Sequence, residues 1–163
     1  KHRVFVRPFK TVHRTESLGY CLFRSGKRLK QEFIGRSGSE LVALKAKGVE
    51  IESHFEELLA AYTGDTQIEF LDVNPWVAHA KILFMEITYF DERKTVETTR
   101  FWGHTHLDEL ALRIHDLHCE KLVLIHPSAR YMDKEMRRIV AAKLPEAWHP
   151  KVVLSPQAKT VLI

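Results

Sequence analysis

Two short and almost continuously apolar runs constrain the fold of this chain more than any other feature. They read KILFMEIT, at Lys81–Thr88, and KLVLI, at Lys121–Ile125. Runs of this length and composition are typical of interior strands that are buried on both faces of a sheet. Between them, apolar residues recur at helical spacing over 107–117 and predict an amphipathic helix that begins near Thr105. Strands that alternate with helices predict an α/β fold.

Weaker patterns add elements on both sides of these runs. The predicted strands are Val4–Phe9, Leu18–Phe23, Glu56–Tyr62 and Val152–Leu154; the predicted helical segments are Glu40–Leu44, Pro75–Ala80 and Met132–Leu144; and Asp91–Arg100 is a polar loop. Ser37 or Ser39 is the expected cap of the first helix. The second strand is expected to close in a basic turn at Gly26.

Length and composition restrict the class of protein. The chain has 163 residues, of which 45% are hydrophobic and 28% charged, which is typical of one globular domain with a core of its own. No apolar run approaches the roughly 20 residues of a membrane span, and the first residues lack a signal-peptide pattern. The chain opens on Lys1 rather than Met and passes directly into a strand pattern, so we expect a piece of a longer protein.

Cysteine usage and charge indicate the compartment and the partners. Cys21 and Cys119 lie far apart and form no C-x-x-C pair. This favours free thiols of an intracellular, most simply cytoplasmic, protein over a disulfide framework or a cysteine zinc site. The net charge of +4 and the pI near 9.1 suit a polyanionic partner without requiring one.

Ionisable side chains next to the strand patterns are the candidates for a functional site. His13 precedes the second strand, Asp65 follows the third, His126 follows KLVLI, and His104 stands at a helix entry. Glu86 lies inside KILFMEIT, where an unpaired carboxylate costs on the order of several kcal/mol. Each has an ordinary structural interpretation by itself, since G-D-T is common turn chemistry. Together, His, Asp and His at successive strand ends suit a dinuclear metal site with a bridging carboxylate.

Five segments, in order, resemble motifs of one family. TVHRTESLGYCL (Thr11–Leu22) resembles its histidine motif with the strand that follows, and AYTGDT (Ala61–Thr66) resembles its GDT motif. FMEITYF (Phe84–Phe90), GHTHLDEL (Gly103–Leu110) and IHPSARY (Ile125–Tyr131) resemble its "HEATF", "GHST" and "HFSPRY" segments. The chain therefore resembles the second half of a metallo-β-lactamase-fold hydrolase, most closely the ribonuclease Z branch, which comprises the tRNA 3′-processing endonucleases.

The resemblance implies both a fold and a set of roles. The fold is half of an αββα sandwich, a mixed sheet with flanking helices. His13 and His126 correspond to zinc ligands, and Asp65 corresponds to the aspartate that bridges both metal ions. His104 corresponds to the histidine that assists the leaving group, and Glu86 to the glutamate that orients it. The last motif further implies two substrate-binding residues, namely Ser128 and Arg130.

The sequence departs from the family in two places. The H-x-H-x-D-H signature, which supplies most of the metal ligands, is absent, because the H-T-H at 104–106 continues L-D-E. Met85 also stands where the family has a histidine. We therefore expect the N-terminal half, with that signature and with the arm that grips tRNA, to lie outside this chain. Two zinc ions are implied for the complete enzyme, and this fragment alone is expected to bind them weakly or not at all.

Three hypotheses on function follow. The first is a zinc-dependent phosphodiesterase, a ribonuclease Z-like endonuclease of precursor tRNA, whose partners are RNA and the N-terminal half, with a homodimer as a further option. The second keeps the fold and acts on a small ester, thioester or phosphodiester. The third is a non-catalytic RNA-binding or scaffold subunit. The basic residues Lys27, Arg28, Lys30, Arg137 and Arg138 could contact RNA phosphates, although a solvated surface is the simpler interpretation.

Overall fold

A single mixed sheet organises the chain. The computed structural model describes residues 2–155, in which six strands pair in the order β1-β2-β3-β4-β5-β6. The strands are β1 (Arg3–Lys10), β2 (Leu18–Leu29), β3 (Glu52–Tyr62), β4 (Ile82–Glu86), β5 (Lys121–Ile125) and β6 (Val152–Leu154). β1, β2 and β3 are antiparallel, whereas β3 to β6 are parallel. The loops after β3, β4 and β5 therefore emerge at one edge, where α/β folds place their sites.

Helices fill the connections between the strands. The α-helices are α1 (Gly38–Ala46), α2 (Phe70–Val73), α3 (Val96–Phe101), α4 (Leu107–Arg113) and α5 (Asp133–Lys143). Short 3-10 helices are η1 (Gln31–Phe33), η2 (Pro75–His79), η3 (Ile114–Asp116) and η4 (Glu146–Trp148). Within residues 2–155, no helix combines the length and the apolar character that crossing a bilayer requires.

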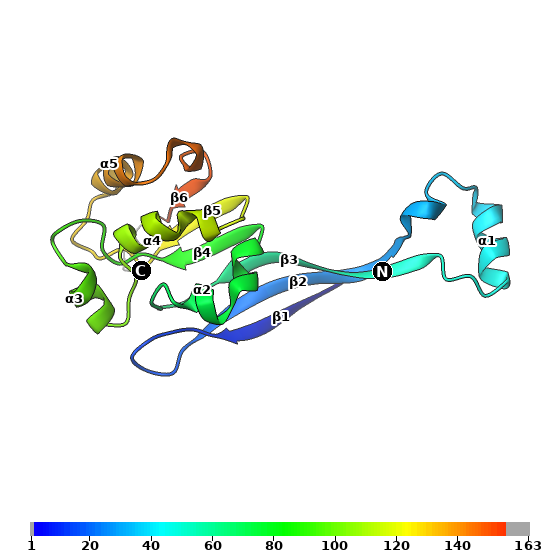
Figure 1. Ribbon diagram of the computed structural model, residues 1–163, viewed down its shortest axis with the longest axis horizontal. Helices are drawn as coiled ribbons and strands as arrows, with labels where there is room; N and C mark the ends of the chain where they lie inside the picture. Colours follow the sequence, from blue (N-terminus) through cyan, green and yellow to red (C-terminus); the bar gives the residue numbers. More distant parts are fainter. Residues whose placement is uncertain (1, 156–163) are drawn as a thin grey trace, which may run out of the picture.

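The core lies between one face of the sheet and the helices. Leu83 and Met85 of β4 and Leu122 and Leu124 of β5 point into it and are at most 1% exposed. They pack with buried side chains of α2, η2, α4 and α5, which include Phe70, Val77, Leu107, Leu110 and Met136. Figure 1 shows α2, α4 and α5 on this side of the sheet. The predicted α/β class is confirmed, with KILFMEIT and KLVLI as interior strands.

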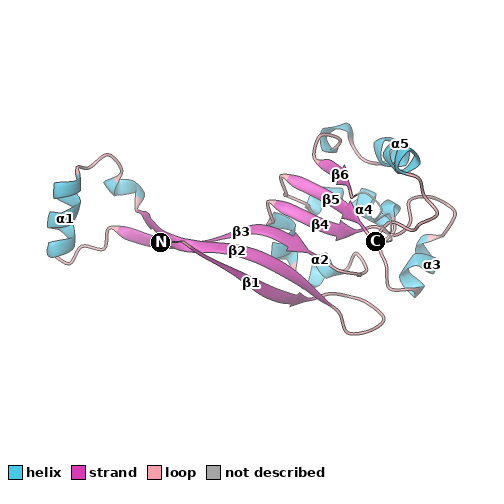
Figure 2. Cartoon of the chain, turned by 180° about the vertical axis from the view of Figure 1, so that it is seen from behind, coloured by secondary structure: helices cyan, strands magenta, loops and turns pink. Residues whose placement is uncertain are grey.

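The opposite face of the sheet is apolar and, among the described residues, no helix packs on it. We call it the open face. Its exposed apolar side chains alternate with the core positions and are 37–59% exposed: Val4, Val6, Leu18, Tyr20, Leu22, Tyr62, Ile82 and Val153. Figure 2 shows the sheet from behind the view of Figure 1, with the strands in front of α2 and α4. One sheet with one helical layer is half of an αββα sandwich, as predicted.

A long arm projects from the body (Figures 1 and 2). It comprises residues 24–57, with α1 at its tip. The strand pairing reaches Leu29, opposite Glu52, because β2 continues through Gly26 instead of turning there. The predicted turn at Gly26 is therefore wrong. The sequence patterns did not predict that this chain carries a projecting arm of its own.

The other differences from the predicted elements lie where the sequence signal is short. Within the predicted loop, α3 forms over only six residues, capped by the Thr95 side chain, and so lacks a visible apolar period. The predicted helix at Thr105 begins instead after His106, whose ring accepts a hydrogen bond from the backbone of Asp108. The imidazole replaces the usual hydroxyl cap and is buried, at 1% exposed. Ser37, one of the two predicted caps, does cap α1.

Candidate metal centre

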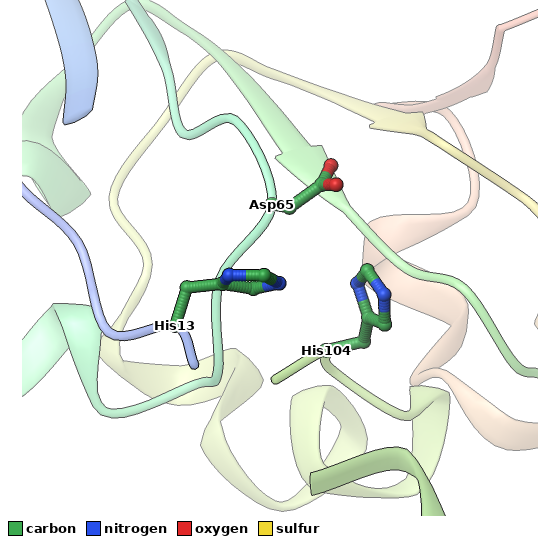
Figure 3. Close-up of side chains that lie close together, drawn as sticks. All are labelled: His13, Asp65 and His104. Carbon is green, nitrogen blue, oxygen red and sulfur yellow. The ribbon is translucent and has the colours of Figure 1, made fainter. Parts of the chain in front are cut away.

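Four separate segments bring imidazole and carboxylate groups to the edge where β3, β4 and β5 end. His13 follows β1, Asp65 follows β3, His104 precedes α4, and His126 follows β5. His13, Asp65 and His104 each place one nitrogen or oxygen within 4.8 Å of the other two (Figure 3). Glu86, His104 and His126 form a second group of the same kind. We call these five residues the ligand edge.

Asp65 lies between the two outer histidines. Gly64 has φ of +63°, a left-handed conformation that glycine adopts without strain, and it turns the chain sharply after β3. Within the described residues, the Asp65 carboxylate makes no hydrogen bond to its own turn; its Oδ1 lies 3.6 Å from Nδ1 of His126. Its side chain is 45% exposed, so it can still accept a ligand.

His126 is held in an unfavourable backbone conformation. Its φ is +59°, and among residues 2–155 it is the one residue other than glycine with a positive φ. The residue before a proline also avoids helical conformations, and Pro127 follows. Such outliers persist where the surroundings enforce them, and they are enriched at functional sites. Here the conformation turns the chain off β5 and directs the ring toward Asp65.

Glu86 is fully buried and surrounded by hydrogen-bond donors. Its Oε1 accepts from the backbone N–H of Thr66 at 3.3 Å and of Thr105 at 3.0 Å, and from Nδ1 of His104 at 3.0 Å. Its Oε2 accepts from the hydroxyl of Thr88 at 3.0 Å. The side chain is 0% exposed, so these bonds replace all of its hydration. The carboxylate therefore ties three loops of the ligand edge together.

The contact with Glu86 sets the proton affinity of His104. The hydrogen bond to Glu86 raises the pKa of the His104 imidazole above its ordinary value of 6.5, while partial burial acts in the opposite direction. The Asp65 carboxylate adds a smaller effect that also raises this pKa. Because Nδ1 donates to Glu86, Nε2 is the nitrogen left to face the other ligand-edge residues.

Threonines connect these groups, and sequence patterns did not identify them. The Thr88 hydroxyl lies 3.0 Å from both Oε2 of Glu86 and Nδ1 of His126. Since it has one proton to give and the carboxylate can only accept, Nδ1–H of His126 donates to it. In the neutral ring with this tautomer, Nε2 carries the lone pair that can bind a metal ion. Buried threonine carries no distinctive sequence signal, because its side chain is common in strands and in loops alike.

The two predicted substrate-binding residues differ in how they connect to the ligand edge. The backbone N–H of Ser128 donates to the carbonyl of Thr88 at 3.0 Å, which keeps it near His126. Arg130 has an exposed side chain, and its carbonyl accepts from the Arg93 guanidinium at 3.1 Å. The structure thus connects Arg130 to the loop before α3 rather than to the metal-ligand candidates.

The donor set of the ligand edge fits a divalent metal ion. Imidazole nitrogens and carboxylate oxygens are the ligands that transition metals share in protein sites. The rings of His13 and His104 lie 5.5 Å apart, and those of His104 and His126 lie 5.2 Å apart. Each of the two groups, His13–Asp65–His104 and Glu86–His104–His126, could supply three ligand atoms to an ion. Assignment of individual ligands stays a prediction.

Comparison with known proteins gives relatives of one kind. No family model matches the chain. It is 39% identical over 142 residues to a tRNase Z from Arabidopsis thaliana, across 86% of this chain and 51% of that protein. It is 31% identical over 142 residues to a chloroplastic tRNase Z from the same plant, across 86% of this chain and 40% of the relative. The chain thus spans about half the length, or less, of these curated relatives.

Solved structures share the fold at low sequence identity. A metallo-β-lactamase-fold protein from Bacillus subtilis matches with a TM-score of 0.55 and 14% identity, over 93% of this chain and 47% of that one. The short form of human tRNase Z matches with a TM-score of 0.51 and 18% identity, over 93% of this chain and 40% of that one. Fold and ligand edge first define the class, which is one half of a metallo-β-lactamase fold. Within that class, the chain resembles the C-terminal half of a ribonuclease Z-like protein, which confirms what its motifs indicated.

Proposed function

We propose that the intact protein is a zinc-dependent phosphodiester hydrolase, a ribonuclease Z-like endonuclease that acts at the 3′ end of precursor tRNA. The relatives that align with 86% of the chain are named tRNase Z. The observation that carries the proposal is the 3.0 Å hydrogen bond between His104 and Glu86 beside His13 and Asp65. It combines a proton donor with metal-ligand candidates, and phosphodiester cleavage needs both.

His13, Asp65 and His126 are the residues we assign to zinc. Asp65 lies between the two histidines and can bridge two ions, one on each side. The bound ions supply Lewis acidity toward a phosphoryl oxygen. The N-terminal half is expected to contribute the remaining ligands. Thr88 restrains the ring of His126 through its 3.0 Å hydrogen bond to Nδ1.

His104 is the residue we assign to protonation of the leaving oxygen. A general acid must be oriented and must carry its proton near neutral pH. The bond from Nδ1 to buried Glu86 orients the ring and raises the pKa of His104. Ser128 and Arg130 are assigned to substrate contact; Ser128 lies next to the edge through Thr88, whereas Arg130 would reach substrate from outside it.

The open face is where we place the N-terminal half. A sheet face with many side chains 37–59% exposed is too apolar to remain in water as a rule. The relatives are about twice as long as this chain, which leaves enough sequence for a second sheet. A second copy of this chain is the other occupant with the right chemistry. Sedimentation of the intact protein distinguishes the N-terminal half from a second copy as the occupant. A homodimer can form through the open face only if the N-terminal half leaves that face uncovered.

RNA is the partner we assign to the arm. Most of its acidic side chains form ion pairs, including Glu50 with Lys30 at 3.4 Å and Glu52 with Lys45 at 3.2 Å. Lys27 and Arg28, in the part of β2 that belongs to the arm, are exposed. A projecting basic element could follow the phosphates of a folded RNA while the scissile bond lies at the ligand edge.

We place the intact protein inside the cell. Cys21 and Cys119 are both buried, and burial raises their pKa values to about 12 and about 11, so both remain unreactive thiols. The relatives include chloroplastic and nuclear proteins, the latter from Triticum aestivum. The cytoplasm is the simplest assignment within this range.

The experiment compares two substrates on the intact protein, precursor tRNA and bis(p-nitrophenyl) phosphate. We expect cleavage of the tRNA at its 3′ side, loss of activity on zinc chelation, and recovery on adding zinc back. His104→Ala should lower kcat by roughly 10²–10⁴-fold with zinc content retained. Equal loss of zinc would make His104 a ligand. Activity on the small diester alone would favour the small-substrate hydrolase, and binding of tRNA without cleavage would favour the scaffold.

A further inference from the structure

An exposed aromatic surface lies next to the ligand edge. Phe101 and Trp102, at the end of α3, are 66% and 50% exposed. Their rings meet edge to face, with centroids 5.3 Å apart and planes at 86°. The guanidinium carbon of Arg14 lies 5.3 Å from the Phe101 ring and 4.9 Å from the Trp102 ring. We call these three side chains the aromatic platform.

Close backbone packing joins the platform to the ligand edge. Gly103, which follows Trp102, has φ of +89°. A Cβ placed on it would lie 2.6 Å from Cδ2 of His13 and 3.0 Å from the backbone nitrogen of Arg14. Only glycine fits this approach, so the segment that carries Trp102 touches the segment that carries Arg14. His104 follows directly, and the platform is therefore continuous with the ligand edge.

The end of α3 is also held rigidly from the other side. The side-chain amide of Gln67 donates to the carbonyl of Arg100 at 2.6 Å. The Arg100 guanidinium pairs with Glu69 at 2.6 Å and with Glu109 at 2.5 Å. The backbone N–H of Gln67 donates to the carbonyl of Val12 at 2.6 Å. The two rings are thus exposed on a fixed support, as a preformed binding surface requires.

We propose that the aromatic platform binds an unpaired nucleobase adjacent to the phosphodiester that the ligand edge holds. The inference rests on the proposed function, and it adds a site for a base to a site for a phosphate. Every nucleobase has a flat face that stacks on aromatic rings or on a guanidinium plane. Arg14 supplies both a plane and a positive charge for the neighbouring phosphate. Its sequence position, directly after His13, places that charge beside the metal-ligand candidates.

The place of the platform favours a nucleic acid over the N-terminal half as its occupant. α3 lies beyond the ends of the strands, to one side of the sheet, rather than on the open face (Figure 1). A substrate bound at His13 and His104 lies next to these side chains, because Gly103 packs against His13 and Arg14. Burial of the rings by the N-terminal half is the alternative that the experiment must distinguish.

The test is binding of a fluorescein-labelled single-stranded RNA tetranucleotide to the intact protein, stripped of metal so that it cannot cleave the probe. The matched control probe carries the same phosphates but abasic riboses. Trp102→Ala should weaken binding of the RNA by about 5- to 150-fold and leave binding of the abasic probe unchanged. Arg14→Lys, which keeps the charge and loses the plane, should weaken RNA more than the abasic probe. Leu112→Ala, which removes an apolar side chain of 83% exposure on α4, should change neither.

The outcomes test nucleobase binding by the aromatic platform independently of tRNA cleavage by the intact protein. Equal weakening of both probes by Trp102→Ala, unchanged RNA binding, or no RNA binding by the wild-type protein would overturn the proposal. Loss of association with the N-terminal half in Trp102→Ala, with RNA binding unchanged, would make the platform an interface and also overturn it. If the intact protein cleaves no tRNA but shows the stacking signature, the proposed function fails and the base site stands.

Discussion

The ligand edge and the arm differ in where their charged side chains lie, with a buried carboxylate in the first and exposed ion pairs in the second. At the ligand edge, Glu86 is 0% exposed and accepts hydrogen bonds from three loops. In the arm, α1 contributes no buried residue, and its acidic side chains meet cations in water. Both regions are rich in charge. The buried charges hold a geometry, whereas the exposed pairs contribute little to stability.

This difference indicates how the two regions can be changed. A buried carboxylate is expensive to leave without partners, and its partners are equally expensive to leave without it. The ligand edge therefore has one arrangement that satisfies all of its polar groups. The arm is joined to the body by two paired strands, β2 and β3. Changes within the arm should therefore have little effect on the stability of the body. We therefore expect substitutions at the ligand edge to lower the free energy of unfolding more than substitutions in the arm.

Removal of the Glu86 carboxylate should give the largest loss. Glu86→Ala removes the hydrogen-bond acceptor of the His104 imidazole, the Thr88 hydroxyl and two backbone N–H groups. We expect the free energy of unfolding in urea to fall by about 3–5 kcal/mol. The matched change in the arm is Glu40→Ala, which removes a half-exposed carboxylate that caps α1 together with Ser37 and should cost much less. Similar losses in both variants would contradict the contrast.

Removal of the Thr88 hydroxyl should have the next largest effect. Thr88→Val keeps the shape and leaves Oε2 of Glu86 and Nδ1 of His126 without their shared partner. We expect a loss of about 1–3 kcal/mol in the free energy of unfolding. Thr88→Ser, which keeps the hydroxyl, should recover most of it. A valine variant as stable as the wild type would show that this bond is not needed.

The ion pair of Glu86 and His104 should make part of the stability depend on pH. The pKa of His104 is raised in the folded chain, so the pair contributes fully below the ordinary value of 6.5. Its contribution is lost as pH rises through the raised pKa. Glu86→Gln should therefore destabilise most below pH 6.5, and the gap to the wild type should narrow at higher pH. Ring-proton NMR should show a lower pKa of His104 in this variant.

Shortening of the arm should have the smallest effect. Leu29 pairs with Glu52, so an Asn-Gly turn can replace residues 30–51 and close a two-residue hairpin. We expect the unfolding temperature of the body to stay within a few degrees of the wild type. The same variant should bind precursor tRNA less tightly if the arm holds RNA. A large drop in unfolding temperature would show that the arm is part of the core.

The sequence predicted the body better than the arm, and it indicated the ionisable side chains of the ligand edge better than the residues that support them. KILFMEIT and KLVLI predicted interior strands because burial on both faces leaves a continuous apolar run. Gly26 was misread as a turn, because a glycine within a solvated strand has no apolar pattern around it. His13, Asp65 and His126 stood out by residue type and position.

The supporting contacts at the ligand edge could not be predicted in the same way. Thr66, Thr88 and Thr105 act through hydroxyls and backbone groups that meet only in the folded chain. Threonine occurs in every kind of element, so its presence near a motif indicates nothing by itself. The left-handed backbone of His126 is a similar case, because the sequence before a proline predicts extended backbone.

The most direct test of the metal-ligand assignment is paramagnetic broadening of histidine ring signals by Co²⁺ in the intact protein, read at the ten histidines of this chain. The ten histidines serve as internal controls, including the stacked pair of His79 and His118 away from the ligand edge. The account predicts that the signals of His13, His104 and His126 broaden together and first, and that Asp65→Ala removes this preference. Broadening of His79 and His118 before these three, uniform broadening of all ten, or a pattern unaffected by Asp65→Ala would contradict it.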